Sequence, residues 1–263
     1  MKNAASLKDL PGLVKEDAVD LEGIYVESLR QRPRSNRQGM FHPSNIGSCG
    51  LRNVYEFTSA EALTTLEPAD LEIFDLGHAI HDVVQSRMDN LQPGCPTGFT
   101  YTFQREVAFD AETDELFHNY GIGGTTDGVL TFSDASGVQR AVLEVKSINS
   151  SGFKDLTAPK PDHLMQATLY AYRFDCPIIY LWYYCKDNSQ RMVYARLFNR
   201  AVFDAAIARY DGWLEHVHAG TLPPREESWY LCPRCEYRET CRPPSLAKAR
   251  GSADLTALRN KKL

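Results

Sequence analysis

The chain has 263 residues, of which 43% are hydrophobic, and it carries a formal net charge of −5. This length and apolar content suffice for one large domain with its own core. The start, Met1–Ser6, lacks the apolar stretch of a signal peptide, and the most apolar run, Ile178–Cys185, is too short to span a bilayer. We therefore expect a cytoplasmic protein that does not enter the membrane. The negative charge does not indicate nucleic-acid binding, and it does not exclude it, because metal ions and local basic patches can neutralise phosphate.

Residues 1–40 are expected to form an N-terminal helix around Leu13–Leu29, followed by a basic linker that spans Arg30–Arg37. A solvated surface is the usual role of such a charge run, and phosphate contact is the alternative. The second predicted region, residues 41–241, holds the core. Residues 242–263 form a basic tail that either contacts DNA or is loose.

Two helices are expected before the first strand. One runs through Leu51–Phe57, with Ser44 or Ser48 as its cap. Apolar residues at helical spacing across Ile73–Met88 predict the other, which carries His81.

Strands and further helices follow. Alternation and turn residues predict three strands, the last two joined as a hairpin at Asp134–Gly137, then a helix from Pro161 that ends before Pro177. The three strands are Tyr101–Phe109, Ile122–Phe132 and Ala141–Ile148, and the later elements are Ile178–Cys185, Met192–Phe198 and a helix over residues 199–218 that closes at Gly220. This order predicts an α/β fold in which a mixed central sheet is flanked by helices.

Four short motifs within about a hundred residues fit one metal site: Gly77-x-x-x-His81, Gly124-x-x-Asp127, Glu144-Val145-Lys146 and Gln166-x-x-x-Tyr170. Glu144 and Lys146 lie two apart on a strand and therefore point to the same side of the sheet. With Asp127 on a neighbouring strand, they form an oxygen-rich pocket for a hard divalent ion. Lys146 can orient or deprotonate the attacking water. This chemistry hydrolyses phosphodiesters.

Each motif also has an ordinary explanation. Glu-x-Lys is commonly a solvated strand face, and an isolated helical His such as His81 is more often structural than a ligand. Their order and their predicted context favour a site, because Asp127 and Glu144 lie within apolar strands where an unpaired carboxylate is costly.

Over about residues 70 to 200 the chain resembles the PD-(D/E)xK phosphodiesterase superfamily and, within it, the RecB-like exonucleases. The resemblance implies that His81, Asp127, Glu144 and the Val145 carbonyl hold one or two Mg²⁺ or Mn²⁺ ions. It also implies that Lys146 positions or activates the water. Two further residues are implied to lie beside the DNA strand, namely Gln166 and Tyr170.

Three of the seven cysteines, Cys232, Cys235 and Cys241, lie within ten residues, and Cys49 is the candidate for a fourth ligand. Zinc sites usually take two short-spaced pairs of ligands, whereas a 4Fe-4S cluster needs four thiolates without such pairing. The arrangement resembles the iron-sulfur members of the RecB-like group, which include the AddB nuclease domain and CRISPR-associated exonucleases. Either centre would join the N- and C-terminal segments. The other three cysteines are interpreted as small hydrophobic residues, namely Cys95, Cys176 and Cys185.

The sequence therefore predicts a metal-dependent DNA exonuclease acting on single strands or free ends, in recombination, repair, phage DNA processing or CRISPR adaptation. Protein partners from those processes are expected with it. A non-cleaving DNA-end-binding or assembly subunit on the same fold is the first alternative. An endonuclease with the same catalytic core is the second.

Overall fold

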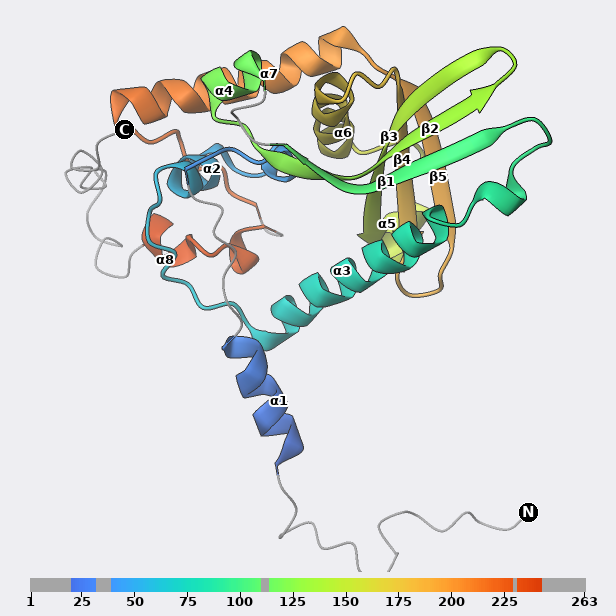
Figure 1. Ribbon diagram of the computed structural model, residues 1–263. Coiled ribbons are helices and arrows are strands. Elements are labelled where there is room, and N and C mark those ends of the chain that lie inside the picture. Colours follow the sequence, from blue (N-terminus) through green and yellow to red (C-terminus); the bar gives the residue numbers. More distant parts are fainter. Residues whose placement is uncertain (1–19, 32–38, 110–113, 229–230, 243–263) are drawn as a thin grey trace, which may run out of the picture. The chain divides into compact units, whose positions relative to one another are not determined.

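The computed structural model describes residues 20–31, 39–109, 114–228 and 231–242 (Figure 1). The chain divides into two compact units, residues 1–35 and residues 36–263. In the first unit, the predicted N-terminal helix appears as α1 (Leu21–Arg30). The start predicted at Leu13, the linker over residues 32–37 and the tail beyond residue 242 lie outside the described residues.

A five-stranded sheet in the order β1-β2-β3-β4-β5 forms the centre of the second unit. Its strands are β1 (Thr100–Phe109), β2 (Gly124–Asp134), β3 (Gly137–Ile148), β4 (Ile178–Cys185) and β5 (Arg191–Leu197). All neighbours pair antiparallel except β3 and β4, which are parallel. The sheet is therefore mixed, and the predicted α/β fold is confirmed. The predicted hairpin is also confirmed, because Asp134 pairs with Gly137 at the turn between β2 and β3.

Helices cover both faces of this sheet, and each face has its own core. The helices of this unit are α2 (Gly50–Phe57), α3 (Pro68–Met88), α4 (Glu115–Tyr120), α5 (Ser150–Lys154), α6 (Pro161–Arg173), α7 (Arg200–Ala219) and α8 (Arg238–Cys241). The short 3₁₀ turns are η2 (Pro43–Asn45), η3 (Gln92–Gly94) and η5 (Cys232–Arg234).

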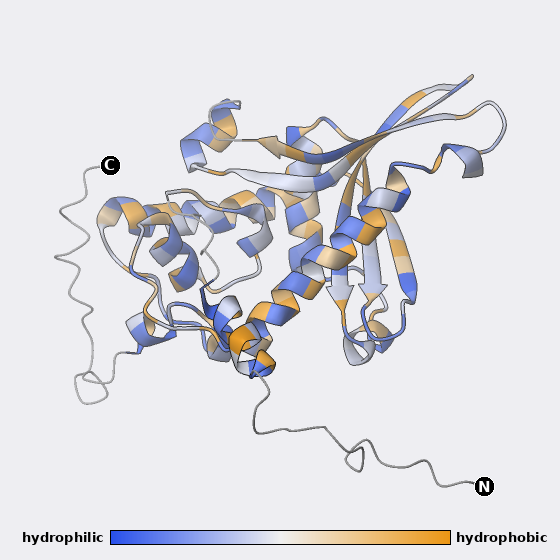
Figure 2. Cartoon of the chain, turned by 60° about the horizontal axis from the view of Figure 1, so that its bottom comes forward, coloured by the Kyte–Doolittle hydropathy of each residue, from blue (hydrophilic) through white to orange (hydrophobic). Residues whose placement is uncertain are grey.

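On one face, α3 packs Ile80, Val84 and Met88 against Leu143 and Val145 of β3. Hydrophobic and hydrophilic residues alternate around α3, which is the pattern of a helix with one buried side (Figure 2). On the opposite face, α6 lies against the sheet and α7 packs on α6. Because β3 and β4 are parallel, the chain needs a crossover between them, and α5 and α6 supply it.

The cap predicted for α2 is wrong. Neither Ser44 nor Ser48 caps this helix, because Ser44 lies within η2 and Cys49 occupies the cap position without a capping side-chain hydrogen bond. Instead, Glu226 Oε1 accepts a hydrogen bond from Gly50 N at 3.2 Å. A carboxylate from far along the chain therefore satisfies the start of α2.

No helix among the described residues combines the length and the apolar character that crossing a membrane requires.

Candidate active site

The predicted site lies where β2 and β3 separate. Their pairing ends at Gly128 and Leu143, and beyond that point the β2 side chains replace its backbone as hydrogen-bonding partners. Thr126 Oγ1 donates to Leu143 O at 3.1 Å, and Asp127 Oδ2 accepts from Val145 N at 2.6 Å. Buried backbone groups must find partners. We call this point of separation, at residues 126–128 of β2 and 143–145 of β3, the fork. It fixes the Asp127 carboxylate against the strand that carries the Glu-x-Lys pair.

Helix α3 contributes two residues to the fork. His81 Nδ1 lies 3.0 Å from Asp127 Oδ1, and Gln85 Nε2 donates to Asp127 O at 2.8 Å. The two residues are four apart and therefore share one face of the helix. Gln85 was not among the residues singled out from the sequence, although its spacing from His81 was an available signal.

Glu144, Lys146 and Gln166 form a closed network on the α6 side of the sheet. Glu144 Oε1 lies 2.9 Å from Lys146 Nζ and accepts from Gln166 Nε2 at 2.6 Å. Lys146 Nζ also donates to Gln166 Oε1 at 2.7 Å. Two of the three ammonium N–H groups are thus used, which leaves one for a substrate or a water.

The surroundings of Glu144 and His81 shift the pKa of both side chains. Burial raises the pKa of Glu144 to about 7, with Asp127 adding to the rise and Lys146 opposing it. Burial lowers the pKa of His81, but the hydrogen bond and the charge of Asp127 outweigh burial and raise it above its ordinary value. Strongly shifted carboxyl groups and histidines are typical of functional sites.

Tyr170 lies at the inner end of the network, completely buried. Its hydroxyl is 3.4 Å from Gln166 Nε2. A Cβ at Gly124 would lie 3.1 Å from Pro43 Cδ and 3.5 Å from the Tyr170 hydroxyl, so a glycine there lets three segments approach closely. The structure therefore assigns Tyr170 a supporting position behind Gln166.

The donor atoms suit a hard divalent ion. Among the described residues, no group of three or more His, Cys, Asp or Glu side chains converges as a ready metal site, and His81 and Asp127 bond to each other. Glu144 Oε2, however, is buried and has no hydrogen-bond partner within the described part of the chain. Leaving a buried carboxylate oxygen unpaired is costly unless something else binds it. An ion held by Glu144, Asp127 and His81 would satisfy that oxygen.

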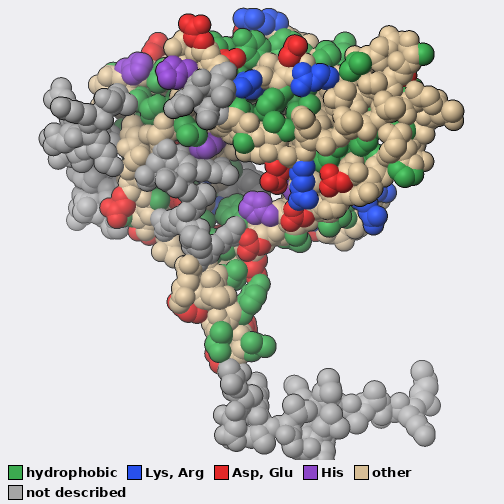
Figure 3. Space-filling view, in the orientation of Figure 1, with side chains coloured by type: hydrophobic (Ala, Val, Ile, Leu, Met, Phe, Trp, Pro, Cys, Tyr) green, Lys and Arg blue, Asp and Glu red, His purple; other side chains and the backbone are tan. Residues whose placement is uncertain are grey.

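The charged residues reach the surface next to α3. Acidic, basic and His side chains gather on the face of the molecule where α3 crosses the sheet (Figure 3). His81 and Lys146 are partly accessible, with 28% and 19% of their side chains exposed, whereas 3% of Glu144 is exposed. The His81 ring and the Lys146 ammonium are therefore more accessible to solvent than the Glu144 carboxylate.

Of the four cysteines of the predicted cluster, three lie in one small hydrophobic cluster, but no three thiols converge as a ready metal site among the described residues. Cys49, Cys235 and Cys241 pack against the buried side chains of Leu51 and Tyr55 in α2 and of Tyr237. Burial raises the pKa of the Cys241 thiol, with Arg225 opposing and the nearby Cys49 and Cys232 adding to the rise. All seven cysteines are free thiols. The arrangement joins the segment before the sheet to the segment after it.

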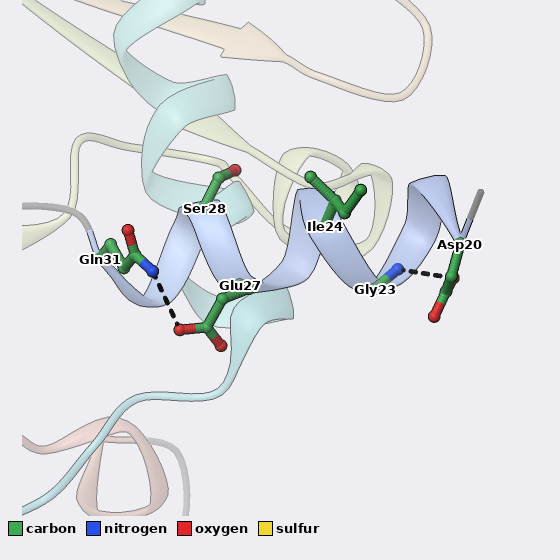
Figure 4. A pocket seen from close by; sticks show the side chains of 6 residues that line it. All are labelled: Asp20, Gly23, Ile24, Glu27, Ser28 and Gln31. Atoms are coloured by element: carbon green, nitrogen blue, oxygen red, sulfur yellow. Dashed lines mark hydrogen bonds between the residues drawn. The ribbon is translucent and has the colours of Figure 1, made fainter.

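A pocket on α1 belongs to neither group. It is lined by Gly23, Ile24 and four polar side chains of the same helix, and Asp20 Oδ1 caps that helix by accepting from Gly23 N at 2.9 Å (Figure 4). None of these residues was predicted as a site residue.

Comparisons with known proteins support the fold. No protein-family model matches the chain, and no curated protein matches it. Among solved structures, SSO0001 is 15% identical with a TM-score of 0.51, and the match covers 84% of this chain and 93% of SSO0001. The alkaline exonuclease LHK-Exo from Laribacter hongkongensis is 13% identical with a TM-score of 0.47, covering 75% of this chain and 93% of LHK-Exo, both alone and in complex with dAMP. The chain shares the architecture of SSO0001, a likeness of fold.

Proposed function

We propose that this protein is a divalent-metal-dependent DNA exonuclease of the RecB-like PD-(D/E)xK type. The observation that carries the proposal is the buried Glu144 carboxylate, with one oxygen held by Lys146 and Gln166 and the other without a partner among the residues that the structure describes. Asp127, fixed by Val145 N, stands on the neighbouring strand. Two carboxylates and a His can hold a divalent ion, and an accessible ammonium beside them can orient a water, which suits metal-assisted phosphodiester hydrolysis.

In this proposal Asp127, Glu144, His81 and the Val145 carbonyl would hold Mg²⁺ or Mn²⁺. The ion would supply charge stabilisation at phosphorus and lower the pKa of water. Glu144 and Gln166 occupy two N–H groups of Lys146, and the third would be offered to the attacking water. Gln166 positions the Lys and the carboxylate together, and buried Tyr170 supports Gln166 next to the DNA strand.

The experiment is cleavage of single-stranded DNA labelled at the 5′ or the 3′ end, with Mg²⁺ or Mn²⁺ and with a chelator. Metal-dependent release of nucleotides from one end supports an exonuclease. Cleavage of a circular single strand would instead show an endonuclease. Binding of DNA ends without cleavage in any metal would support the non-cleaving subunit and contradict the proposal.

We also propose that Cys49, Cys232, Cys235 and Cys241 hold a 4Fe-4S cluster, with Zn²⁺ as the alternative ion. Three of them, Cys49, Cys235 and Cys241, pack in one hydrophobic cluster, and Cys232 is near enough to Cys241 to raise its pKa; this proximity supports a shared centre, and thiolates are the ligands of both cofactors. Free thiols fit a reducing compartment such as the cytoplasm. Iron and zinc analysis of protein purified without oxygen, with its absorbance spectrum, tests the assignment. Recombination, phage or CRISPR-adaptation proteins are the partners that this activity would serve.

A further inference from the structure

His163 is a buried titratable residue next to the site to which the proposed chemistry gives no role. It lies in the first turn of α6, three residues before Gln166 and seven before Tyr170. Residues at these separations line one face of a helix. His163 therefore extends, toward the start of α6, the row of side chains that contacts Glu144 and Lys146.

One ring nitrogen of His163 is fixed by Tyr183. His163 Nδ1 forms a hydrogen bond with the Tyr183 hydroxyl at 3.0 Å. The same hydroxyl accepts a hydrogen bond from Lys160 N, also at 3.0 Å. The Lys160 N–H can only donate, so it uses one lone pair of the hydroxyl and leaves the hydroxyl proton free to be donated to Nδ1. In that arrangement the ring proton resides on Nε2. Tyr183 pairs with Lys146 across β3 and β4, which anchors this contact beside the ammonium.

The charges around the ring keep it neutral. Burial, together with the positive charges of Lys146 and Lys160 and against the opposing carboxylate of Asp162, lowers the pKa of His163 to about 3. A ring with so low a pKa is not a general acid at neutral pH. It is a neutral N–H donor in a field that Lys146 makes positive, and such a field attracts an anionic acceptor.

The Nε2 atom is available for that acceptor. Its nearest carboxylate oxygen, Asp162 Oδ2, lies 3.9 Å away, which is beyond hydrogen-bond distance, and 18% of the His163 side chain is exposed. Since Nδ1 points at Tyr183, which is completely buried, the accessible part of the ring is its other edge. Within the described residues Nε2 has no hydrogen-bond acceptor.

We propose that His163 is a substrate-binding residue whose Nε2–H donates to a non-bridging phosphate oxygen of the DNA, adjacent to the scissile phosphate. The inference rests on the proposed nuclease function and deepens it by adding a second phosphate position beside the metal site. Tyr183 acts through His163 by keeping the proton on Nε2.

The test measures cleavage of single-stranded oligonucleotides that each carry one uncharged methylphosphonate at a defined position. His163→Ala should raise KM on the order of tenfold, the effect of one hydrogen bond to a charged group, with kcat nearly unchanged. A methylphosphonate at one position flanking the scissile phosphate should raise KM for the wild type and have no further effect on His163→Ala. His163→Gln, which keeps a terminal N–H donor, should restore most of the affinity, and Tyr183→Phe should raise KM partway. His118→Ala, on exposed α4, is the matched control and should behave as wild type.

If the two effects on KM add at every methylphosphonate position, His163 does not contact phosphate. A lowered melting temperature with KM unchanged would likewise overturn the inference and leave His163 as a packing residue. These results leave the nuclease proposal intact, whereas a wild-type protein without cleavage in any metal would contradict that proposal. The inference would then be decided by the affinity of the same oligonucleotides for the wild type and His163→Ala, measured by fluorescence anisotropy.

Discussion

Glu144 combines two properties that rarely occur together: complete burial and a carboxylate oxygen without a partner among the described residues. Lys146 and Gln166 both contact Oε1 of this carboxylate. Burial nevertheless raises the pKa of Glu144 to about 7, so its charged form is disfavoured. Such a group is costly for stability when it has no ion to bind. Its substitution should therefore separate catalysis from folding.

Glu144→Gln keeps the shape of the side chain and removes the negative charge. We expect cleavage to fall by at least about a hundredfold, with Mn²⁺ affinity reduced and DNA binding retained, because the change removes a metal ligand rather than a DNA contact. Single-turnover kinetics and calorimetric Mn²⁺ titration check this. Glu215→Gln, on the exposed side of α7, is the control. Cleavage at the wild-type rate by folded Glu144→Gln would contradict the site.

His163 should make stability depend on pH. Its pKa is about 3 in the folded protein and about 6.5 in an unfolded chain, so below pH 6.5 the unfolded state binds the proton that the folded state refuses. The contribution of neutral His163 is present above pH 6.5 and is lost as the pH falls toward 3. The difference in unfolding free energy between wild type and His163→Gln should shrink by at most about 1.4 kcal/mol per pH unit. Urea unfolding of both proteins at pH 8 and pH 5.5 measures it, and an unchanged difference would refute the burial of a neutral ring.

Among the helices and strands, local sequence patterns predicted those that carry a signal of their own, either turn residues or an apolar period. The hairpin β2–β3 has its turn residues at Asp134–Gly137, and α3 has its apolar period. The helices α4 and α5 were not predicted, because six and five residues are too few to show a period. The position of α2 was predicted to within a residue, but its capping residue was not, because the group that accepts from Gly50 N is Glu226, 176 residues away.

The same limit applies to the site. The motifs predicted which residues approach the fork, since each carried a recognisable spacing. They did not predict that Asp127 would bind Val145 N or that Thr126 would bind Leu143 O, because both contacts arise where two strands separate. That separation depends on the packing of whole elements rather than on a local pattern.

Two glycines should respond in opposite directions to the same substitution. Gly121 ends α4 with φ of +60°, and a Cβ there would lie 2.8 Å from Phe57 Cε2, so Gly121→Ala should destabilise the protein by about 1 kcal/mol or more. Gly212 lies in α7 with φ in the ordinary range and nothing within 4 Å of its Cβ position, so Gly212→Ala should stabilise by about 0.5–1 kcal/mol. Chemical denaturation of both variants checks the signs. Equal effects would contradict the backbone assigned to residue 121.

The second unit of the chain is closed by contacts between its early and late segments. Thr240 Oγ1 donates to Glu61 O at 2.7 Å, Glu239 N donates to Thr64 Oγ1 at 3.0 Å, and Arg234 binds Asp70 at 2.6 Å. The late residues of these contacts lie in the same short segment as Cys232, Cys235 and Cys241. A centre bound there would close a loop of more than 180 residues, from Cys49 to Cys232 and beyond.

Cys49→Ser should remove the iron and the absorbance near 400 nm expected of a Cys-ligated cluster, and should lower the melting temperature, because an incomplete site no longer joins the two segments. Cys95→Ser is the matched control, since Cys95 is also half-buried but lies apart in the turn after η3. Metal analysis and thermal unfolding measure both effects. Full iron content in Cys49→Ser would exclude it as a ligand, and stoichiometric zinc in a colourless wild type would replace the cluster with a zinc site.

The two halves of the site, the Lys146–Glu144–Gln166 network and the His81–Asp127 contact, are expected to form at different stages of folding. Lys146 and Glu144 find Gln166 within 20 and 22 residues, inside one strand–helix–strand segment, whereas His81 must close 46 residues to reach Asp127. Contacts between residues near in sequence lose less chain entropy on closing and form sooner. We therefore expect the Lys–Glu–Gln network to be assembled before α3 docks. Docking of α3 then brings His81 and completes the site in the last step of folding.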